Sequence, residues 1–285
     1  MPVNDEHIIE AAGRTPVLIR GGKVVSVGKP LISDCPLAKK FSHPVMEMNE
    51  AEIKKNIEER ISSFGMCTKN REVLSDDDFV LFGASELISS AIDGGLLDCA
   101  VIACDGAGTV IAKNPRLVQG IGGKMSGLAK TCPYPEVIRR INENGGHVVF
   151  EEDAAVDAYK GYMKAVELGF FRIAVTVACG RDAEIIRNTD QNAVIFAVHT
   201  TGAGKEEAQM LADSCDIVFA CASKTVREIA GKSALLQGGI SVPVYAMTQA
   251  GKNIILEKLR KTNKQILIKG EILPASSKKE PHPLI

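Results

Sequence analysis

Four apolar segments of this chain end in the same way, with a thiol or an imidazole followed by a turn of small residues. They are AVIACDGAG (100–108), IAVTVACG (173–180), AVIFAVHTTGAG (193–204) and DIVFACAS (216–223). Each segment is rich in β-branched residues, has the length of a strand and precedes a helical pattern. Buried strands that alternate with helices are typical of a parallel sheet covered on both faces. The pattern therefore predicts an α/β fold: a doubly wound, mostly parallel sheet in a Rossmann-like arrangement of three layers.

The polar groups that end these segments are three thiols and one imidazole. They belong to Cys104, Cys179, His199 and Cys221. Open α/β sheets bind ligands just outside the carboxyl ends of their strands. We therefore expect a functional site at that edge of the sheet, and we also expect two of the four groups to be ordinary core residues.

Charge and composition exclude several classes of partner. Lys and Arg number 34 against 35 Asp and Glu, so no net field favours nucleic acid or a membrane surface. No apolar stretch approaches the roughly 18 residues of a spanning helix, and the first residues lack the order of a signal peptide. We expect a cytoplasmic protein whose partner is a small molecule or another protein, with an oligomer left open.

The chain divides into three predicted parts. Residues 1–75 form an N-terminal lobe with a hairpin at 17–28 and a helix over about 49–63, whose Asn49 and Glu52 fit a capping box. Residues 76–274 form the α/β core. Residues 275–285 form a flexible tail that lacks the apolar content to order itself.

Within the core, a segment rich in Gly, Lys and Pro interrupts the alternation of strands and helices at 106–135. We interpret it as a long loop, and long loops inside compact domains tend to be functional. Its glycines would either let a ligand approach the backbone or only shape the loop. The glycines concerned are Gly106, Gly108, Gly120, Gly122 and Gly123. Two further strands are expected, FVLF (79–82) before the first core helix and QILIKGEIL (265–273) before the tail.

The turn TTGAGK (200–205) follows a predicted strand and opens a helix. Backbone amides at such a position hold phosphate or carboxylate groups, with Lys205 as the counter-charge. It is not a Walker motif, because His199 stands where that motif has Gly and Glu206 follows the lysine. Either the turn binds an anion or its glycines only allow the chain to enter the helix. The candidate anion-binding residues are Thr200, Gly202, Gly204 and Lys205.

Two kinds of chemistry fit the groups at the strand ends. Three thiolates and an imidazole suit zinc or an iron–sulfur cluster, whereas one thiolate with His199 as base suits nucleophilic catalysis. The candidate catalytic residues are Cys104, Asp105, His199 and Cys221. For a single cysteine a buried structural role is the alternative, since free cysteine is among the most buried residue types. Cys35, Cys67 and Cys132 lie in or beside loops and either plug the N-terminal lobe or reach towards Cys104.

Several motifs resemble one known family. They are DEHIIEAAGRT, CPL, FGM, FGASE and, above all, CDGAGTVIAKNPRLVQGIGGKMSGL (104–128). Together they resemble methanogenesis marker protein 8, a domain of unknown function. The resemblance implies a role in the methane metabolism of strictly anaerobic archaea, with relatives in some anaerobic bacteria. It also implies help in maturing or modifying methyl-coenzyme M reductase or its nickel cofactor, but it brings no established catalytic residues.

Two functions of different classes follow. The first is an enzyme or maturation factor that acts on a small anionic substrate or cofactor through the thiols at the strand ends. The alternative is a non-catalytic assembly partner of a methanogenesis enzyme complex such as methyl-coenzyme M reductase, whose glycine-rich loops form an interaction surface.

Overall fold

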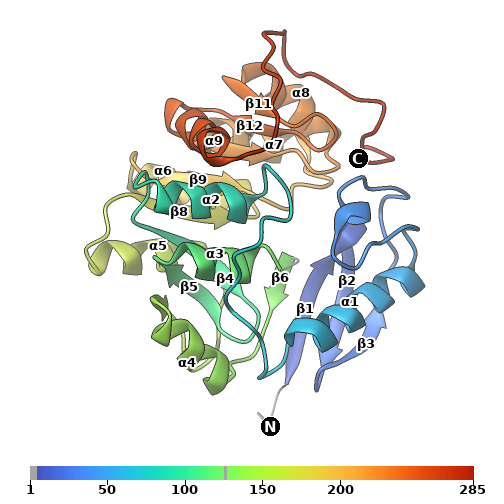
Figure 1. Cartoon of the computed structure of the whole chain (residues 1–285), viewed down its shortest axis with the longest axis vertical. Helices are drawn as coiled ribbons and strands as arrows, with labels where there is room; N and C mark the ends of the chain where they lie inside the picture. Colours follow the sequence, from blue (N-terminus) through green and yellow to red (C-terminus); the bar gives the residue numbers. More distant parts are fainter. Residues whose placement is uncertain (1–4, 125–126) are drawn as a thin grey trace.

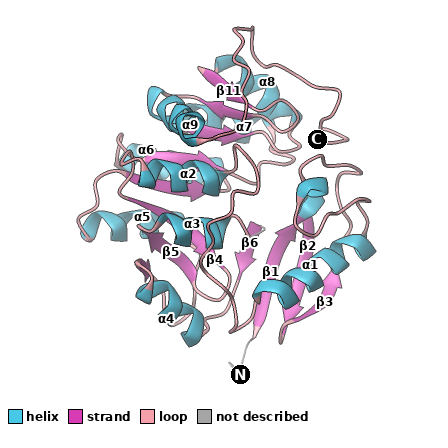
Figure 2. Ribbon diagram, in the orientation of Figure 1, coloured by secondary structure: helices cyan, strands magenta, loops and turns pink. Residues whose placement is uncertain are grey.

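Two β-sheets organise the molecule, and a computed structural model describes residues 5–124 and 127–285 of it (Figures 1 and 2). The smaller sheet is antiparallel and carries α1 (Glu50–Phe64). Its strands in spatial order are β3 (Lys23–Val27), β2 (Thr15–Arg20), β1 (Glu6–Ala11) and β6 (Gly127–Lys130). The hairpin predicted at 17–28 is thus confirmed. The predicted helix is confirmed too, and the side chain of its N-cap Asn49 accepts a hydrogen bond from the amide of Glu52.

The larger sheet has eight strands. In spatial order they are β11 (Leu236–Gly238), β12 (Val244–Ala246), β10 (Ile217–Phe219), β9 (Val194–Ala197), β8 (Ile173–Val177), β4 (Cys99–Cys104), β5 (Gly108–Ala112) and β7 (Gly146–Val148). The four central strands β10, β9, β8 and β4 pair in parallel, and the two strands at each edge pair antiparallel. The prediction of a mostly parallel sheet is therefore not confirmed: the sheet is mixed, and its parallel part is the centre.

Helices cover both faces of this sheet. On one face α2 (Ala84–Asp93), α3 (Pro115–Gly122), α4 (Pro135–Glu143) and α9 (Gln249–Lys261) contribute to one apolar core. On the other face lie α5 (Ala158–Glu167), α6 (Gly180–Thr189), α7 (Lys205–Ser214) and α8 (Lys224–Ser233). Successive residues of β4 point to opposite cores, Val101 to the second and Ile102 to the first. The three layers of an α/β protein are thus present.

The predicted loop at 106–135 is wrong. The chain reverses after β4 through a turn in which Gly106 has φ +85° and Gly108 φ +70°, and β5 then runs antiparallel to β4. Helix α3 and strand β6 follow, and β6 leaves the larger sheet to pair with β1 of the smaller one. The glycine content concealed two strands and a helix, and Met125 and Ser126 of this segment lie outside the described residues.

Two predicted strands are also wrong. Residues 79–82 form bends, because the Glu86 carboxylate accepts hydrogen bonds from the amides of Phe79 and Val80, at 3.1 and 3.2 Å. Those amides are not engaged in a strand ladder. Residues 265–273 are irregular, and Leu267 is 90% exposed, so this apolar segment pairs with no strand of the described chain.

The predicted bounds at residues 75 and 275 stay predictions, and one feature bears on each. Strand β6 lies inside the range 76–274 yet completes the N-terminal sheet. The final residues have fixed main-chain partners: the carbonyl of His282 accepts from Ser33 and Asp34, and the amide of Ile285 donates to Ala222. Among the described residues, no helix is long and apolar enough to cross a bilayer.

A close approach between α3 and the chain before α2 generates a prediction. In an open helix, replacing Gly by Ala gains about 1 kcal/mol of stability. A Cβ on Gly120, however, would lie 2.2 Å from the carbonyl oxygen of Val73 and 2.5 Å from the carbonyl carbon of Leu74. Because both are backbone atoms, we expect Gly120→Ala to lower the free energy of unfolding by about 1–3 kcal/mol, measured by urea denaturation.

Gly270→Ala is the matched control, since a Cβ there meets nothing within 4 Å. Its free energy of unfolding should stay within about 0.5 kcal/mol of the wild type. A Gly120→Ala protein as stable as this control would show that the segment before α2 yields easily.

Candidate functional site

The predicted groups do lie at one edge of the larger sheet, because the strands that carry them are parallel neighbours. Cys104 ends β4, Cys179 follows β8, His199 follows β9 and Cys221 follows β10. The structure nevertheless places them in three different surroundings. Only His199 and Cys221 share a third partner.

Cys104 and Asp105 lie in a buried ion pair. The Asp105 carboxylate accepts from Nε of Arg71 at 2.9 Å and from the amide of Cys67 at 2.6 Å, and both charged side chains are at most 1% exposed. The Cys104 thiol donates to the carbonyl of Asp105 at 3.3 Å. The side chain of Cys67 belongs to the apolar core of the N-terminal lobe, as the plug alternative expected, and only its amide contacts the turn after Cys104.

The electrostatics of this pair favour a structural role. Burial alone would raise the pKa of Asp105, but the Arg71 guanidinium and the Cys67 amide hold it below its ordinary value. Burial raises the pKa of the Cys104 thiol well above the ordinary range. A matched carboxylate and a protonated, enclosed thiol are poorly prepared for proton transfer or nucleophilic attack.

Cys179 lies at the N-cap of α6 and is half-buried. The amide of the next residue, Gly180, donates to the Glu207 carboxylate of α7. Burial raises the pKa of the Cys179 thiol, and the nearby carboxylates of Asp182 and Glu207 add to the effect. The carboxylate of Glu207 thus occupies the helix terminus that would otherwise favour a thiolate here.

His199 and Cys221 lie where the larger sheet meets the smaller one, and we call the group of Glu10, Gly127, His199 and Cys221 the sheet junction. Glu10 of β1 places a carboxylate oxygen 4.0 Å from Nδ1 of His199, and the charge of Glu10 also acts on the Cys221 thiol. Both residues have the left-handed backbone, with φ +58° at His199 and +44° at Cys221. Such conformations are strained for residues other than glycine and cluster at functional sites.

The pKa shifts of the three groups share one cause. Desolvation lowers the pKa of His199, although its side chain is 38% exposed, and raises the pKa values of Cys221 and Glu10, while Arg14 opposes the last effect. At neutral pH these shifts favour a neutral His199 imidazole and a protonated Cys221 thiol. The imidazole can accept a proton, and the Cys221 thiol, like that of Cys104, becomes a nucleophile only when a base removes its proton.

Strand β6 contributes Gly127 to the sheet junction. A Cβ on Gly127 would lie 3.0 Å from Cβ of Glu10 and 3.4 Å from Nδ1 of His199. A larger residue here would press on the imidazole, so the glycine keeps room beside it.

The TTGAGK turn is partly filled by protein atoms. Arg14 donates to the carbonyl of Thr201 at 2.8 Å, and its guanidinium occupies the space beside Gly202. Thr200 is buried, and its hydroxyl donates to the carbonyl of Phe219. Gly204 is open and precedes α7, which no side chain caps; with Lys205 it borders a surface hollow of about 470 Å³.

The other predicted glycines face protein. A Cβ on Gly108 would meet the carbonyl of Ala154 at 2.2 Å, one on Gly106 the ring of Tyr134 at 2.9 Å, and one on Gly123 the Gln119 amide at 2.7 Å. Gly120 and Gly122 likewise abut protein atoms of the chain before and at the start of α2. Close packing explains why a side chain is absent at these positions, and any ligand role for them stays a prediction.

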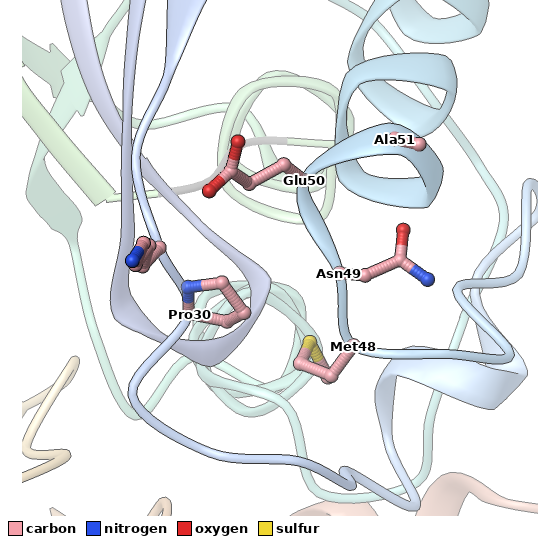
Figure 3. Close-up of a pocket in the computed structure, with 6 residues that line it drawn as sticks. Pro30, Met48, Asn49, Glu50 and Ala51 are labelled. Carbon is pink, nitrogen blue, oxygen red and sulfur yellow. The ribbon is translucent and has the colours of Figure 1, made fainter.

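A further hollow, of about 640 Å³, lies between the residues after β3 and the start of α1 (Figure 3). Its lining includes Pro30, Met48 and Glu50 but none of the residues predicted to be functional. The side chain of Asn49, also in the lining, caps α1. We assign no chemistry to this hollow.

Sequence reasoning missed Glu10, Arg14 and Arg71. All three reach the core edge from the N-terminal part of the chain, so no local pattern links them to it. The spacing of Glu10 and Arg14 was a visible signal, and their side chains do form an ion pair at 3.6 Å.

The fold defines a three-layer α/β protein whose second, antiparallel sheet contacts the carboxyl edge of the first at the sheet junction. Residues 7–260 match the family described as "Uncharacterized protein conserved in archaea (DUF2099)", and the chain belongs to this family.

A relative from Methanocaldococcus jannaschii, a methanogen, is described as "Uncharacterized protein MJ0054". It is 40% identical over 284 residues, which cover 99% of this chain and 100% of the relative. No solved structure matches the chain.

The buried ion pair generates a prediction. Asp105→Asn would leave the Arg71 guanidinium buried without a counter-charge, and breaking such a pair costs about 3–5 kcal/mol. Asp76→Asn is the control, because its pair with Arg116 is exposed and is worth at most about 1 kcal/mol. Urea denaturation at pH 7 should separate the two variants by at least about 2 kcal/mol.

The same pair gives a pH dependence with a defined sign. The folded pKa of Asp105 is below its unfolded value of about 3.9, so its stabilisation is present above about pH 4 and is lost as pH falls through the folded pKa. The difference between wild type and Asp105→Asn should therefore shrink in acid. A difference that stays constant down to pH 2 would contradict this account.

Proposed function

We propose that this protein is an enzyme or maturation factor of methane metabolism, corresponding to methanogenesis marker protein 8. It acts on a small anionic substrate or cofactor at the sheet junction. The archaeal family and the methanogen relative support the metabolic context. His199 serves as acid or base, Cys221 supplies the thiol, and Glu10 orients the imidazole.

One observation carries this proposal. His199 and Cys221 end adjacent parallel strands, both have strained left-handed backbones, and both are influenced by the same carboxylate of Glu10. The core residue Cys67 also has a left-handed backbone, with φ +55°, so the proposal depends on the combination of all three features. Cys104, Asp105 and Cys179 lack it, so the proposal gives them no catalytic role.

Charge explains the preference for an anion. Arg14 and Lys205 both belong to the turn region beside His199, and the uncapped amides at the start of α7 add the positive end of the helix dipole. In this proposal Thr200 holds the turn against β10, and Gly204 leaves the amides accessible. Gly202 contributes its backbone only, since Arg14 fills the space beside it.

Competing alkylating reagents test the proposal. Iodoacetate is a small anion and iodoacetamide is its neutral analogue, so their rate ratio at one thiol reports the local field. Peptide-resolved mass spectrometry should give a higher ratio of iodoacetate to iodoacetamide at Cys221 than at Cys179, which lies among carboxylates. Lys205→Ala should lower the ratio at Cys221 by up to about fivefold, since one nearby charge is worth about 1 kcal/mol in water.

Lys264→Ala is the control, because this exposed lysine lies beyond α9. His199→Asn should slow both reagents at Cys221 without changing their ratio, since it removes a base and not a charge. A ratio at Cys221 equal to that at Cys179, and unaffected by Lys205→Ala, would rule out the anion site.

A second function, the non-catalytic assembly partner, is favoured by a separate observation. Leu267, Ile268 and Ile272 are 80–91% exposed on the irregular segment that follows α9. Exposed apolar residues in such number mark interaction surfaces. Co-sedimentation with purified methyl-coenzyme M reductase should form a complex that the triple variant Leu267→Ser, Ile268→Ser, Ile272→Ser weakens; no complex with the wild type would remove this alternative.

A further inference from the structure

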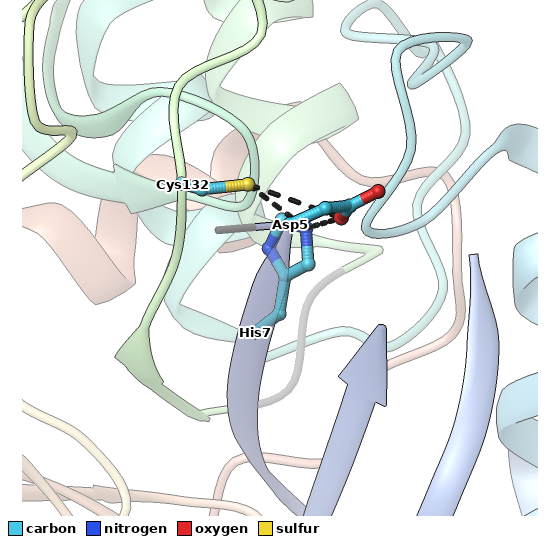
Figure 4. A group of neighbouring side chains, drawn as sticks. All are labelled: Asp5, His7 and Cys132. Carbon is cyan, nitrogen blue, oxygen red and sulfur yellow. Dashed lines mark hydrogen bonds and ion pairs between the residues drawn. The ribbon is translucent and has the colours of Figure 1, made fainter. Parts of the chain in front are cut away.

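A cluster of three potential metal ligands lies at the opposite end of β1 from Glu10 (Figure 4). Asp5 and His7 are two residues apart at the start of β1, so their side chains share a face. Cys132 follows β6, which pairs with β1 so that Lys130 opposes Ile8. Strand β6 ends at Lys130, and the chain beyond it brings the sulfur of Cys132 to within 4.8 Å of the ligand atoms of Asp5 and His7.

The distances between the three ligand atoms match a tetrahedral metal site. Nε2 of His7 lies 3.5 Å from Oδ1 of Asp5 and 3.6 Å from Sγ of Cys132, and the sulfur lies 4.0 Å from the same oxygen. Zinc bound to nitrogen, oxygen and sulfur at its usual bond lengths requires ligand separations of about 3.3–3.6 Å. Closure by a few tenths of an ångström would complete the geometry.

The surroundings of His7 resemble those of a metal-bound imidazole. Nδ1 lies 2.7 Å from the hydroxyl oxygen of Thr131, which also accepts from the amide of Gly106 at 2.8 Å. With the Nδ1 proton directed to Thr131, Nε2 carries the lone pair that a metal would bind, and its neighbour there is the Tyr134 hydroxyl at 3.1 Å. His7 is fully buried, so the ring is held in place by these contacts.

Hydrogen bonding alone does not account for this arrangement. The hydroxyl of Tyr134 lies 2.5 Å from Asp5 and 3.1 Å from Nε2 of His7, and these are good hydrogen bonds. Cys132, however, meets the same two atoms only at distances where a thiol is a weak donor. A cation gives the sulfur a strong partner.

We propose that Asp5, His7 and Cys132 bind one zinc ion, with the fourth position next to the hydroxyl of Tyr134. The carboxylate and a Cys132 thiolate supply two negative charges for a divalent cation, and this mixture of nitrogen, oxygen and sulfur disfavours magnesium and calcium. The side chain of Asp5 is 16% exposed, so the ion can enter from that side. The site links the start of β1 to the chain after β6, and it shares no residue with the sheet junction at His199.

Cobalt substitution tests the proposal on the full chain. The protein is purified anaerobically, stripped with a chelator and titrated with Co²⁺, which reports a tetrahedral thiolate site by intense visible bands and a sulfur-to-metal absorption in the near ultraviolet. We expect one Co²⁺ per chain, displaced by Zn²⁺. Affinity should rise with pH, because a cysteine thiol must lose its proton to bind a metal ion.

Variants locate the site. Cys132→Ser should abolish the near-ultraviolet absorption, whereas Cys179→Ser, which removes a distant half-buried thiol, should leave it unchanged. Asp5→Asn changes a partly exposed residue with little effect on packing, so it should fold and still lower Co²⁺ affinity at least about tenfold. Circular dichroism confirms folding of each variant.

Wild-type protein that binds no Co²⁺ with a sulfur-to-metal absorption would overturn the proposal. So would an absorption that survives Cys132→Ser in a folded protein, or one that Cys179→Ser removes. Purification with iron and sulfide in place of a single divalent ion would also overturn it, since one cysteine cannot hold a cluster. None of these outcomes depends on the reactivity of Cys221, so this test and that of the proposed function can fail separately.

Discussion

The buried pair of Arg71 and Asp105 is the interaction on which the relation between the two sheets depends. Its guanidinium donates to Asp105, in the turn after β4, and also to the carbonyls of Gly120 and Ile121 at 3.2 and 3.3 Å near the end of α3. The ring of Phe64, the last residue of α1, lies 4.9 Å below it. One cation therefore joins both layers, and desolvating it is tolerable because carbonyl and carboxylate oxygens surround it.

This pair also explains why the edge of the larger sheet is divided. Four parallel strands deliver polar groups to one line, but the first of them is absorbed into the ion pair and the second lies among carboxylates at a helix terminus. The remaining two groups, His199 and Cys221, lie beside Glu10 at the sheet junction. A sheet edge thus provides a place for chemistry, and the segments packed over it decide which residues are left to perform it.

The central strands could be predicted from the sequence because burial on both faces leaves a continuous apolar run that few other structures produce. The region 106–135 could not. Its glycines have the composition of a loop, yet Gly120 is a helical residue that needs no side chain because the carbonyl of Val73 lies against it. Glycine required for close packing and glycine required for turning look identical in a sequence.

Candidate site residues divide along the same line. His199 and Cys221 were visible because they end recognisable strands. Asp5, His7, Glu10 and Arg71 were not, because their partners lie between 34 and 189 residues away along the chain. In the sequence of β1 the charged residues Glu6 and Glu10 flank positions that the structure shows to face inwards, namely His7, Ile9 and Ala11.

The pairing of β1 with β6 sets an order on folding during synthesis. The hairpin of β2 and β3 is local, whereas the outer neighbour of β1 is made more than a hundred residues later. Until residues 127–132 have left the ribosome, one edge of β1 is unpaired and His7 lacks its contacts with Thr131 and Cys132. The N-terminal sheet is therefore begun first and finished only after β4 and β5 exist, which couples the two sheets in time as well as in space.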